Sequence, residues 1–140
     1  IRTMLGRNIE NLAIIENGKK TDNEIELSKA NTSVDIFNPK VIRASMGSIF
    51  NINIEVFHSF DDYQKRFSNH CYAFCLEGSS PLETLEKNKD NFSLVFGNEA
   101  TGLPQEITKK CVPVRITQSN KIDSFNLAIS VAMALYEFTK

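Results

Sequence analysis

Short apolar stretches alternate with polar or amphipathic stretches along this 140-residue chain. Five of the apolar stretches have the length and the β-branched or aromatic content of buried strands. They are Asn11–Glu16, Asn53–Phe57, Tyr72–Leu76, Phe92–Phe96 and Val112–Ile116. Helical patterns follow them, and this alternation predicts an α/β domain with a mainly parallel sheet and flanking helices. Spacing alone favours an open, doubly wound sheet.

The segments between the expected strands carry start and stop signals of helices. A first helix is expected over Lys40–Ser48, with Pro39 in its first turn. A second is expected over Ser59–Phe67, because Ser59 can cap it and its charges suit the helix dipole at both ends. A third, short helix is expected over Pro104–Lys110. The remaining expectations are the end of a helix at Ile1–Leu5 before Gly6, a loop at Lys19–Val34 and a helical turn at Leu82–Lys87.

The end of the chain predicts a helix that is apolar on nearly every side. Its apolar part runs from Leu127 to Leu135 and contains no charged side chain. A helix without a polar face has to be buried, either inside the domain or against a second copy of the chain. Asp123, Ser124 and Asn126 stand at its entrance and are good N-cap residues. A buried helix that starts beside a polar loop is a place where a small ligand can bind.

The composition is that of a soluble, single-domain globular protein. Hydrophobic residues make up 41% and charged residues 24%. No apolar run approaches the roughly 20 residues that a membrane-spanning helix needs. The net charge of -1 gives no overall sign of nucleic-acid binding, although local basic patches matter more than the total. The sequence starts at Ile1 rather than Met, and we expect a preceding segment to be missing from it.

The cysteine pattern predicts neither disulfides nor a metal site. Cys71, Cys75 and Cys111 form no Cys-x-x-Cys pair and no metal-spaced set. We expect reduced core thiols in a cytoplasmic protein.

A loop with two glycines follows the expected strand Phe92–Phe96. Its sequence, GNEATGL over Gly97–Leu103, permits tight turning and close approach of the backbone to a ligand. In parallel α/β sheets, ligands gather at the carboxyl ends of strands. On spacing alone, a plain glycine turn with a solvated Glu99 explains the motif at least as well.

Three motifs, in order, resemble those of the SpoU (TrmH-like) RNA ribose 2'-O-methyltransferases of the SPOUT class. Arg2-Thr3, with the later stretch Arg43–Gly47, is similar to the first motif and its sequel. The glycine loop is similar to the second motif, and Ile116 with Ser124–Asn126 is similar to the third. The resemblance covers the chain nearly end to end. It implies a parallel sheet with a deep trefoil knot at its C-terminal end, and a homodimer formed through the C-terminal helix.

The resemblance also implies S-adenosylmethionine as the cofactor and RNA as the substrate. The positions that match cofactor contacts are Leu76, Gly97, Ile116 and Phe125. The positions that match catalytic residues are Arg2, Glu99, Ser124 and Asn126. The basic residues expected at the RNA are Arg2, Lys40 and Arg43. Phe125 departs from the leucine usual in the family, which keeps the apolar character but changes the shape.

The reaction so implied is attack of a ribose 2'-hydroxyl on a sulfonium methyl group. The family's arginine is assigned the activation of that hydroxyl. A guanidinium stays protonated at ordinary pH, so Arg2 can instead bind a phosphate bidentately and orient the hydroxyl. Ser124 and Asn126 can be helix caps at the same time. Lys40 and Arg43 lie about one helical turn apart and can face one partner.

The main hypothesis is therefore S-adenosylmethionine-dependent methylation of a ribose 2'-hydroxyl in tRNA or rRNA. The alternative is a non-catalytic knotted module that binds RNA. A generic nucleotide-binding domain has the least support, because the sequence contains neither a GxGxxG nor a GxxxxGK[ST] phosphate loop.

Overall fold

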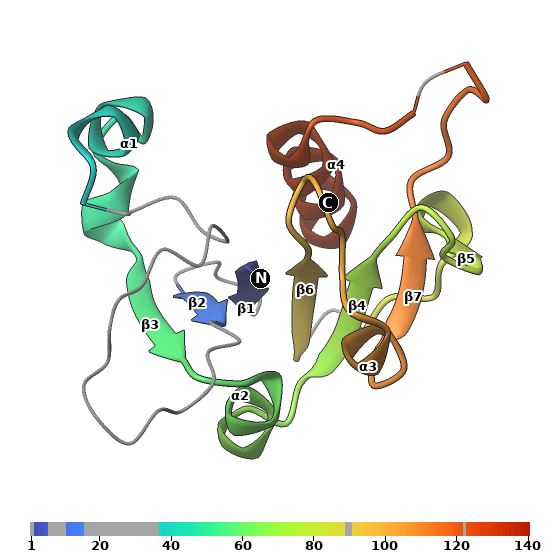
Figure 1. Ribbon diagram of the computed structural model, residues 1–140, viewed down its shortest axis with the longest axis horizontal. Coiled ribbons are helices and arrows are strands. Elements are labelled where there is room, and N and C mark those ends of the chain that lie inside the picture. The colour runs from blue at the N-terminus through green and yellow to red at the C-terminus, as the bar shows by residue number, and fades with distance from the viewer. Residues whose placement is uncertain (1, 6–10, 16–36, 89–90, 122) are drawn as a thin grey trace.

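The computed structural model describes residues 2–5, 11–15, 37–88, 91–121 and 123–140. Their strands form one seven-stranded sheet in the order β3-β2-β1-β6-β4-β7-β5 (Figure 1). The strands are β1 (Arg2–Leu5), β2 (Asn11–Ile15), β3 (Asn53–Phe57), β4 (His70–Phe74), β5 (Ser80–Pro81), β6 (Phe92–Phe96) and β7 (Val112–Arg115). Of the six described strand pairs four are parallel, and β1 makes the two antiparallel ones. The prediction of a mainly parallel α/β sheet is confirmed.

Helices cover both faces of the sheet (Figure 1). They are α1 (Pro39–Ala44), the 3-10 helix η1 (Ser48–Asn51), α2 (Phe60–Arg66), the 3-10 helix η2 (Leu82–Thr84), α3 (Gln105–Thr108) and α4 (Leu127–Thr139). On one face, Tyr63 of α2 and Ile107 of α3 pack in a core cluster with Val95. On the other face, Leu82 of η2 and Phe138 of α4 belong to a second core cluster.

Strand β6 lies between β1 and β4 and is buried along its whole length. Its side chains alternate between the faces, as the pleat requires. Phe92, Leu94 and Phe96 join the cluster under α4, whereas Val95 joins the cluster under α2 and α3. Ser93 points the same way as Val95, and its hydroxyl hydrogen-bonds to Tyr63 Oη at 2.6 Å and accepts from Asn69 Nδ2 at 3.1 Å. The one polar residue of this strand is therefore satisfied inside the core.

The caps of the first two helices follow from their sequences. Asn38 Oδ1 accepts a hydrogen bond from Lys40 N at 2.9 Å, and Pro39 occupies the first position of α1. Ser59 Oγ accepts from Asp62 N at 3.1 Å and donates to the Asp62 carboxylate at 2.9 Å. The cap predicted for Ser59 is thus confirmed.

The predicted helix at Ile1–Leu5 is wrong, because Arg2–Leu5 forms β1. The backbone of this segment pairs with β2 on one side and with β6 on the other. Ladder hydrogen bonds on both edges outweigh the weak helical preference of a segment too short to form a stable helix alone. Gly6 and the predicted loop Lys19–Val34 lie outside the described residues.

The predicted helix Lys40–Ser48 divides into two elements. α1 ends at Ala44, and Met46 and Gly47 have φ angles of 49° and 82°. Two consecutive residues in the left-handed region cannot continue a right-handed helix. The right-handed helix is interrupted there, and the 3-10 helix η1 begins at Ser48.

The third predicted strand, Tyr72–Leu76, is shifted. β4 begins at His70 and ends at Phe74, so Leu76 lies beyond it with 63% of its surface exposed. The short strand β5 was not predicted. It pairs only with β7, which lies far away in the sequence, and two residues carry no periodicity that could announce it.

Helix α4 is buried on one side only, so of the two predicted alternatives, burial inside the domain is wrong and burial against a second copy stays a prediction. Ala134 and Phe138 are buried against the sheet. Ile129, Met133 and Tyr136 lie on the surface, and Tyr136 is 68% exposed. Burial of this face therefore requires something outside the single chain.

All three cysteines are free thiols. Cys71 lies in the core, as predicted, whereas Cys75 and Cys111 are half-buried. A hydrogen bond between the thiols of Cys71 and Cys111 lowers the pKa of Cys71 and raises that of Cys111. The described residues contain no group of three or more His, Cys, Asp or Glu side chains placed to hold a metal ion. No helix in the described part of the chain is long and apolar enough to cross a membrane.

Candidate cofactor-binding and catalytic site

Three loops leave one edge of the sheet together. β4, β6 and β7 are neighbouring parallel strands, so their carboxyl ends meet (Figure 1). The described residues that follow these ends are 75–79, 97–104, 116–121 and 123–126. The predicted site residues on these loops are Leu76, Gly97, Glu99, Ile116, Ser124, Phe125 and Asn126. This edge is where parallel sheets bind their ligands.

The loop after β6 is closed by its own backbone. Gly102 N donates to Asn98 O at 2.8 Å, and Ala100 N donates to Asn98 Oδ1 at 2.7 Å. Gly102 has a φ of 67°, a conformation that glycine adopts without strain. The loop therefore forms a tight turn that carries Glu99 at its exposed tip.

Gly97 is required by the same turn. A Cβ at this position would lie 2.2 Å from the carbonyl carbon of Gly102 and 2.5 Å from Leu103 N. These are backbone atoms, so no side-chain movement could make room. The loop can fold back on the end of β6 only because residue 97 is a glycine.

Gly78 is a second close-approach glycine, and the sequence analysis missed its importance. A Cβ there would lie 2.4 Å from the carbonyl carbon of Val114. Cys75 N also donates to Val114 O at 3.0 Å. The loop after β4, with Leu76 on it, is therefore held directly on the end of β7. A glycine just after a strand was the available signal, but the contact itself is tertiary.

The third loop ends in the cap of α4. Asn126 Oδ1 accepts from Ala128 N at 2.9 Å, which confirms Asn126 as the N-cap. Ser124 is exposed and Phe125 is half-buried. The cap engages the oxygen of the Asn126 side chain, and the amide nitrogen of the same side chain is a donor group.

A pocket of about 220 Å³ opens beside the start of this loop. It lies between η2, the end of β7 and α4, and its lining residues are Leu82, Glu83, Ile116, Thr117, Met133, Tyr136 and Glu137. Of the predicted cofactor contacts only Ile116 lines it. Leu76 and Gly97 lie on the neighbouring loops, and Phe125 lies further along the same loop as Ile116. The α4 and η2 residues were not predicted because only the tertiary fold brings them to Ile116.

Two carboxylates line this pocket, and both are held ionised. A hydrogen bond from the hydroxyl of Thr117 lowers the pKa of Glu83. Hydrogen bonds from Lys140 and Lys87 lower the pKa of Glu137, whose carboxylate lies 2.8 Å from Lys140 Nζ and 3.2 Å from Lys87 Nζ. Because Glu137 is already paired with two lysines, Glu83 is the carboxylate that this pocket offers to a cationic group beside its apolar walls.

The backbone of Arg2 lies next to the glycine loop. Arg2 pairs with Phe96 on one side and with Ile14 on the other. Because β1 runs antiparallel to β6, the first residue of β1 sits at the carboxyl end of β6, one residue from Gly97. The side chain of Arg2 lies outside the described part of the structure.

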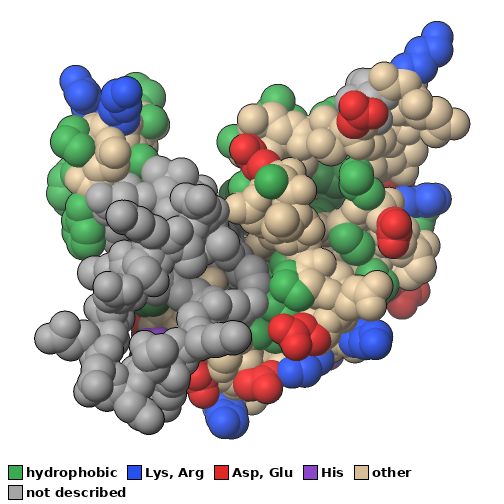
Figure 2. All heavy atoms as spheres, in the orientation of Figure 1, with side chains coloured by type: hydrophobic (Ala, Val, Ile, Leu, Met, Phe, Trp, Pro, Cys, Tyr) green, Lys and Arg blue, Asp and Glu red, His purple; other side chains and the backbone are tan. Residues whose placement is uncertain are grey.

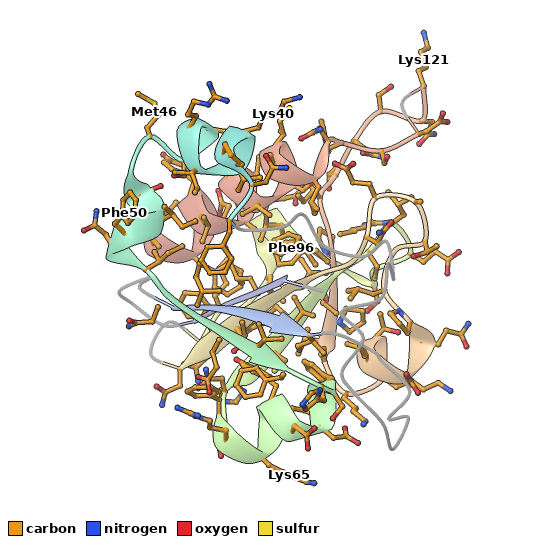
Figure 3. All side chains as sticks on the ribbon, turned by 60° about the vertical axis from the view of Figure 1, so that its left-hand side comes forward. Lys40, Met46, Phe50, Lys65, Phe96 and Lys121 are labelled. Atoms are coloured by element: carbon orange, nitrogen blue, oxygen red, sulfur yellow. The ribbon has the colours of Figure 1, made fainter. Side chains whose placement is uncertain are left out.

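Lys40 and Arg43 are exposed on α1, and Arg43 Nε donates to Pro39 O at 3.3 Å. Figures 1 and 3 both place α1 and the start of α4 at the same end of the molecule. Lys40 and Lys121 point outward at that end in Figure 3, and Figure 2 shows basic side chains at both of its tips. The predicted RNA-contacting residues of α1 therefore lie on the side of the molecule that carries the three loops.

The model of the SpoU rRNA Methylase family matches residues 26–136, which is most of the chain. The chain belongs to the SpoU rRNA Methylase family. The family predicted from the three motifs is thus confirmed.

Two curated relatives support the assignment to the SpoU family. A Lactobacillus gasseri protein named as a candidate RNA (cytidine(34)-2'-O)-methyltransferase is 30% identical over 109 residues, covering 73% of this chain and 58% of the relative. A Listeria monocytogenes protein named as a candidate tRNA (cytidine(34)-2'-O)-methyltransferase is 30% identical over 110 residues, covering 68% of this chain and 59% of the relative. The chain thus spans less than two thirds of the length of either relative.

Solved structures share the SpoU fold. An rRNA methyltransferase from Sinorhizobium meliloti with bound AdoMet is 29% identical, with a TM-score of 0.73 over 94% of this chain and 46% of that one. A structure described for the 2-OH methylation of C/U34 on tRNA is 25% identical, with a TM-score of 0.68 over 75% of this chain and 70% of that one. The fold of this chain is therefore shared with these two solved structures.

Proposed function

We propose that this SpoU domain uses S-adenosylmethionine to methylate a ribose 2'-hydroxyl in tRNA or rRNA. The observation that carries the proposal is the meeting of three loops at the carboxyl ends of β4, β6 and β7, two of which carry the SpoU motif residues. The S. meliloti relative with bound AdoMet and the two relatives named for cytidine 2'-O-methylation support it.

The residues at this edge fit the cofactor by their chemistry. Leu82, Ile116 and Met133 offer apolar walls for a flat base, and Glu83 complements positive charge. Leu76, Gly97, Ile116 and Phe125 would hold the cofactor. When bound, it supplies a methyl group on a positively charged sulfur, so the leaving group needs no further activation by the protein.

The remaining residues position the acceptor. We assign Arg2 to a phosphate beside the target ribose, because a guanidinium is a permanent bidentate donor and a poor base. The amide nitrogen of Asn126 and the hydroxyl of Ser124 are donors at the start of α4, where they can orient the ribose. Glu99 stands at the exposed tip of the glycine loop and can accept hydrogen bonds from Arg2 or from the RNA. Holding the hydroxyl in line with the methyl group then lowers the barrier.

A transfer assay tests this function. The full-length protein is incubated with S-adenosylmethionine labelled in its methyl group and with unmodified total RNA, and the labelled nucleoside is identified after digestion. We expect a 2'-O-methylnucleoside whose formation falls at least about a hundredfold in Arg2→Ala and about tenfold in Glu99→Gln. Lys65→Gln, a change on the exposed surface of α2, is the matched control and should keep full activity.

The same assay separates the catalytic proposal from the non-catalytic alternative. Cofactor and RNA binding by calorimetry, with no methyl transfer to any RNA, would favour the binding module. The absence of both cofactor binding and transfer would overturn the proposal.

We propose that the exposed face of α4 binds a second copy of the chain. The face consists of Ala128, Ile129, Ala132, Met133 and Tyr136, which recur at the spacing of one helical stripe. A two-fold contact through this stripe would bury it on both copies. Sedimentation should give a dimer for the wild type and a monomer for Ile129→Glu, and a folded wild-type monomer would contradict the proposal.

The trefoil knot and the cytoplasmic location remain proposals of the same kind. The knot is supported by the contact of the 75–79 loop with the end of β7 at Val114. An experimental structure traced through residues 75–140 would test it. A cytoplasmic location is supported by the three free thiols, and fluorescence of a tagged full-length protein in cells would test it.

A further inference from the structure

The segment formed by α1 and η1 carries no buried residue in either helix. A hydrogen-bonded turn joins the two helices. Ser45 Oγ donates to Ile42 O at 2.7 Å, and Ser48 Oγ donates to Ser45 O at 2.5 Å. Met46 N donates to Arg43 O at 3.1 Å. We call the outer side of this segment, made of Lys40, Arg43, Met46 and Phe50, the α1–η1 ledge.

The apolar residues of the segment differ in burial according to their type. The β-branched ones are half-buried, namely Val41, Ile42, Ile49 and Ile52. Met46 and Phe50 face outward with 95% and 80% of their surfaces exposed. Figure 3 shows both side chains pointing away from the body of the molecule, on the element that also carries Lys40. Large apolar side chains exposed together at a fixed turn mark a surface that contacts a partner.

The charge of the ledge has one sign. Residues 37–54 include Lys40 and Arg43 and no Asp or Glu, although the whole chain has a net charge of -1. Within the part of the chain that the structure describes, neither Lys40 nor Arg43 forms an ion pair. The hydrogen bond from Arg43 Nε to Pro39 O leaves the outer nitrogens of the guanidinium for another acceptor. The ledge is therefore a cationic surface with an aromatic ring and a thioether on it.

We propose that the α1–η1 ledge binds unpaired nucleotides of the RNA substrate. Phe50 stacks on a base, Met46 packs its polarisable sulfur against the same or the next base, and Lys40 and Arg43 contact the flanking phosphates. Every base has a face on which an aromatic ring can stack, whereas the bases of a duplex are already stacked on each other. The proposal rests on the proposed function and narrows its substrate to RNA with a single-stranded segment.

A second copy of the chain fits this ledge less well than RNA does. A two-fold contact would be isologous and would bring Lys40 and Arg43 close to the same residues of the other copy. Like charges would then face each other with no acidic residue between positions 37 and 54 to neutralise them. Phosphates neutralise both cations, and binding releases the counterions of the RNA.

The test compares binding of three RNAs of equal length by the full-length protein, with fluorescence anisotropy at graded salt concentrations. The RNAs are a stem with an unpaired loop, a fully paired duplex and an unstructured single strand. We expect Phe50→Ala to weaken binding of the loop and the single strand about tenfold and to leave duplex binding unchanged. Met46→Ala should act in the same direction with a smaller factor. Lys40→Gln and Arg43→Gln should each weaken binding of all three RNAs. Each should also reduce the steepness of the plot of log K against log salt concentration by about one.

Two exposed residues elsewhere provide matched controls. Val56→Ala removes an exposed apolar side chain from β3, and Lys65→Gln removes an exposed cation from α2, and both should bind RNA like the wild type. Equal binding of loop RNA by Phe50→Ala and wild type would overturn the proposal that the ledge binds RNA. A change from dimer to monomer in Phe50→Ala would also overturn it. Methyl transfer by the wild type decides the proposed function separately, because it does not depend on this comparison.

Discussion

Two regions of this domain contain similar side chains and treat them in opposite ways. Phe138 of α4 is buried, with its ring centroid 4.8 Å from that of Tyr72 and 4.9 Å from that of Phe92. Phe50 of η1 is almost fully exposed and makes no described ring contact. Both residues sit in helical segments next to the same sheet.

The difference suggests that aromatic residues stabilise the fold in one region and serve binding in the other. The region of β6 and α4 uses aromatic rings to close the core, so these rings stabilise the fold. The α1–η1 ledge leaves the Phe50 ring 80% exposed, so this ring contributes little to folding and can contact a partner. If this division holds, substitutions in the first region change stability, and substitutions in the second change binding.

The largest effect is expected from Phe138→Ala. Truncating a buried aromatic residue removes apolar burial and leaves a cavity, which costs about 3–5 kcal/mol. Urea unfolding followed by circular dichroism should show a fall of that size in the free energy of unfolding. A loss below about 1 kcal/mol would mean that α4 does not close the core as the structure shows.

Gly97→Ala should have the next largest effect, and it tests the candidate site at the end of β6. The added methyl group would collide with the backbone of Gly102 and Leu103, so the loop has to shift. We expect a loss of about 1–3 kcal/mol in stability, together with at least about tenfold weaker cofactor binding by calorimetry. Gly47→Ala is the control. Its Cβ would meet nothing within 4 Å, so only the positive φ is strained and cofactor binding should not change.

Tyr63→Phe should cost less, about 1–2 kcal/mol at pH 7. The change removes the hydrogen bond between Tyr63 Oη and Ser93 Oγ, but Ser93 keeps its bond from Asn69. Thermal or urea unfolding measures the loss. A variant as stable as the wild type would show that this buried hydroxyl is neutral to folding.

The same tyrosine makes a prediction about pH. Burial raises the pKa of Tyr63 from 10.0 to about 12. Between these pH values Tyr63 loses its phenol proton in the unfolded chain but keeps it in the folded protein. Ionisation therefore favours the unfolded chain, and the free energy of unfolding falls as the pH rises. The stability contributed by the neutral phenol is therefore present below pH 10 and lost as the pH rises towards 12. The difference between wild type and Tyr63→Phe should shrink or change sign over that range.

The sequence predicted best those elements whose signals are local. The strands Asn53–Phe57 and Phe92–Phe96 were predicted with the bounds that the structure gives. Phe92–Phe96 is nearly all apolar, Asn53–Phe57 alternates polar and apolar residues at its start, and each is followed by a polar or glycine residue. The cap at Ser59 was predicted because Ser-x-x-Asp at the start of a helix is a short-range pattern. β1 was missed because its conformation is set by pairing with two strands, one of them β6 far along the chain.

The candidate site divides along the same line. The motifs placed Gly97, Ile116 and Asn126 on loops at one edge, since parallel strands bring their carboxyl ends together. The close approach of Gly78 to Val114 and the pocket between η2 and α4 depend on contacts between distant segments, which no local pattern encodes. The exposure of Met46 and Phe50 was also missed, because the helix was expected to run on to Ser48 and the turn at Met46 breaks it.

Phe50→Ala should have the smallest effect on stability and so sharpens the comparison with Phe138→Ala. The ring is 80% exposed, so its removal takes little apolar surface out of the protein interior, and the free energy of unfolding should change by less than about 0.5 kcal/mol. Urea unfolding of the two alanine variants under one set of conditions gives the contrast directly, because the same side chain is truncated in both. A loss above about 1.5 kcal/mol in Phe50→Ala would mean that the ring is covered by the chain itself, and the ledge would then belong to the core. An unchanged stability together with weaker binding of unpaired RNA would instead show that a phenylalanine is held in water for its partner.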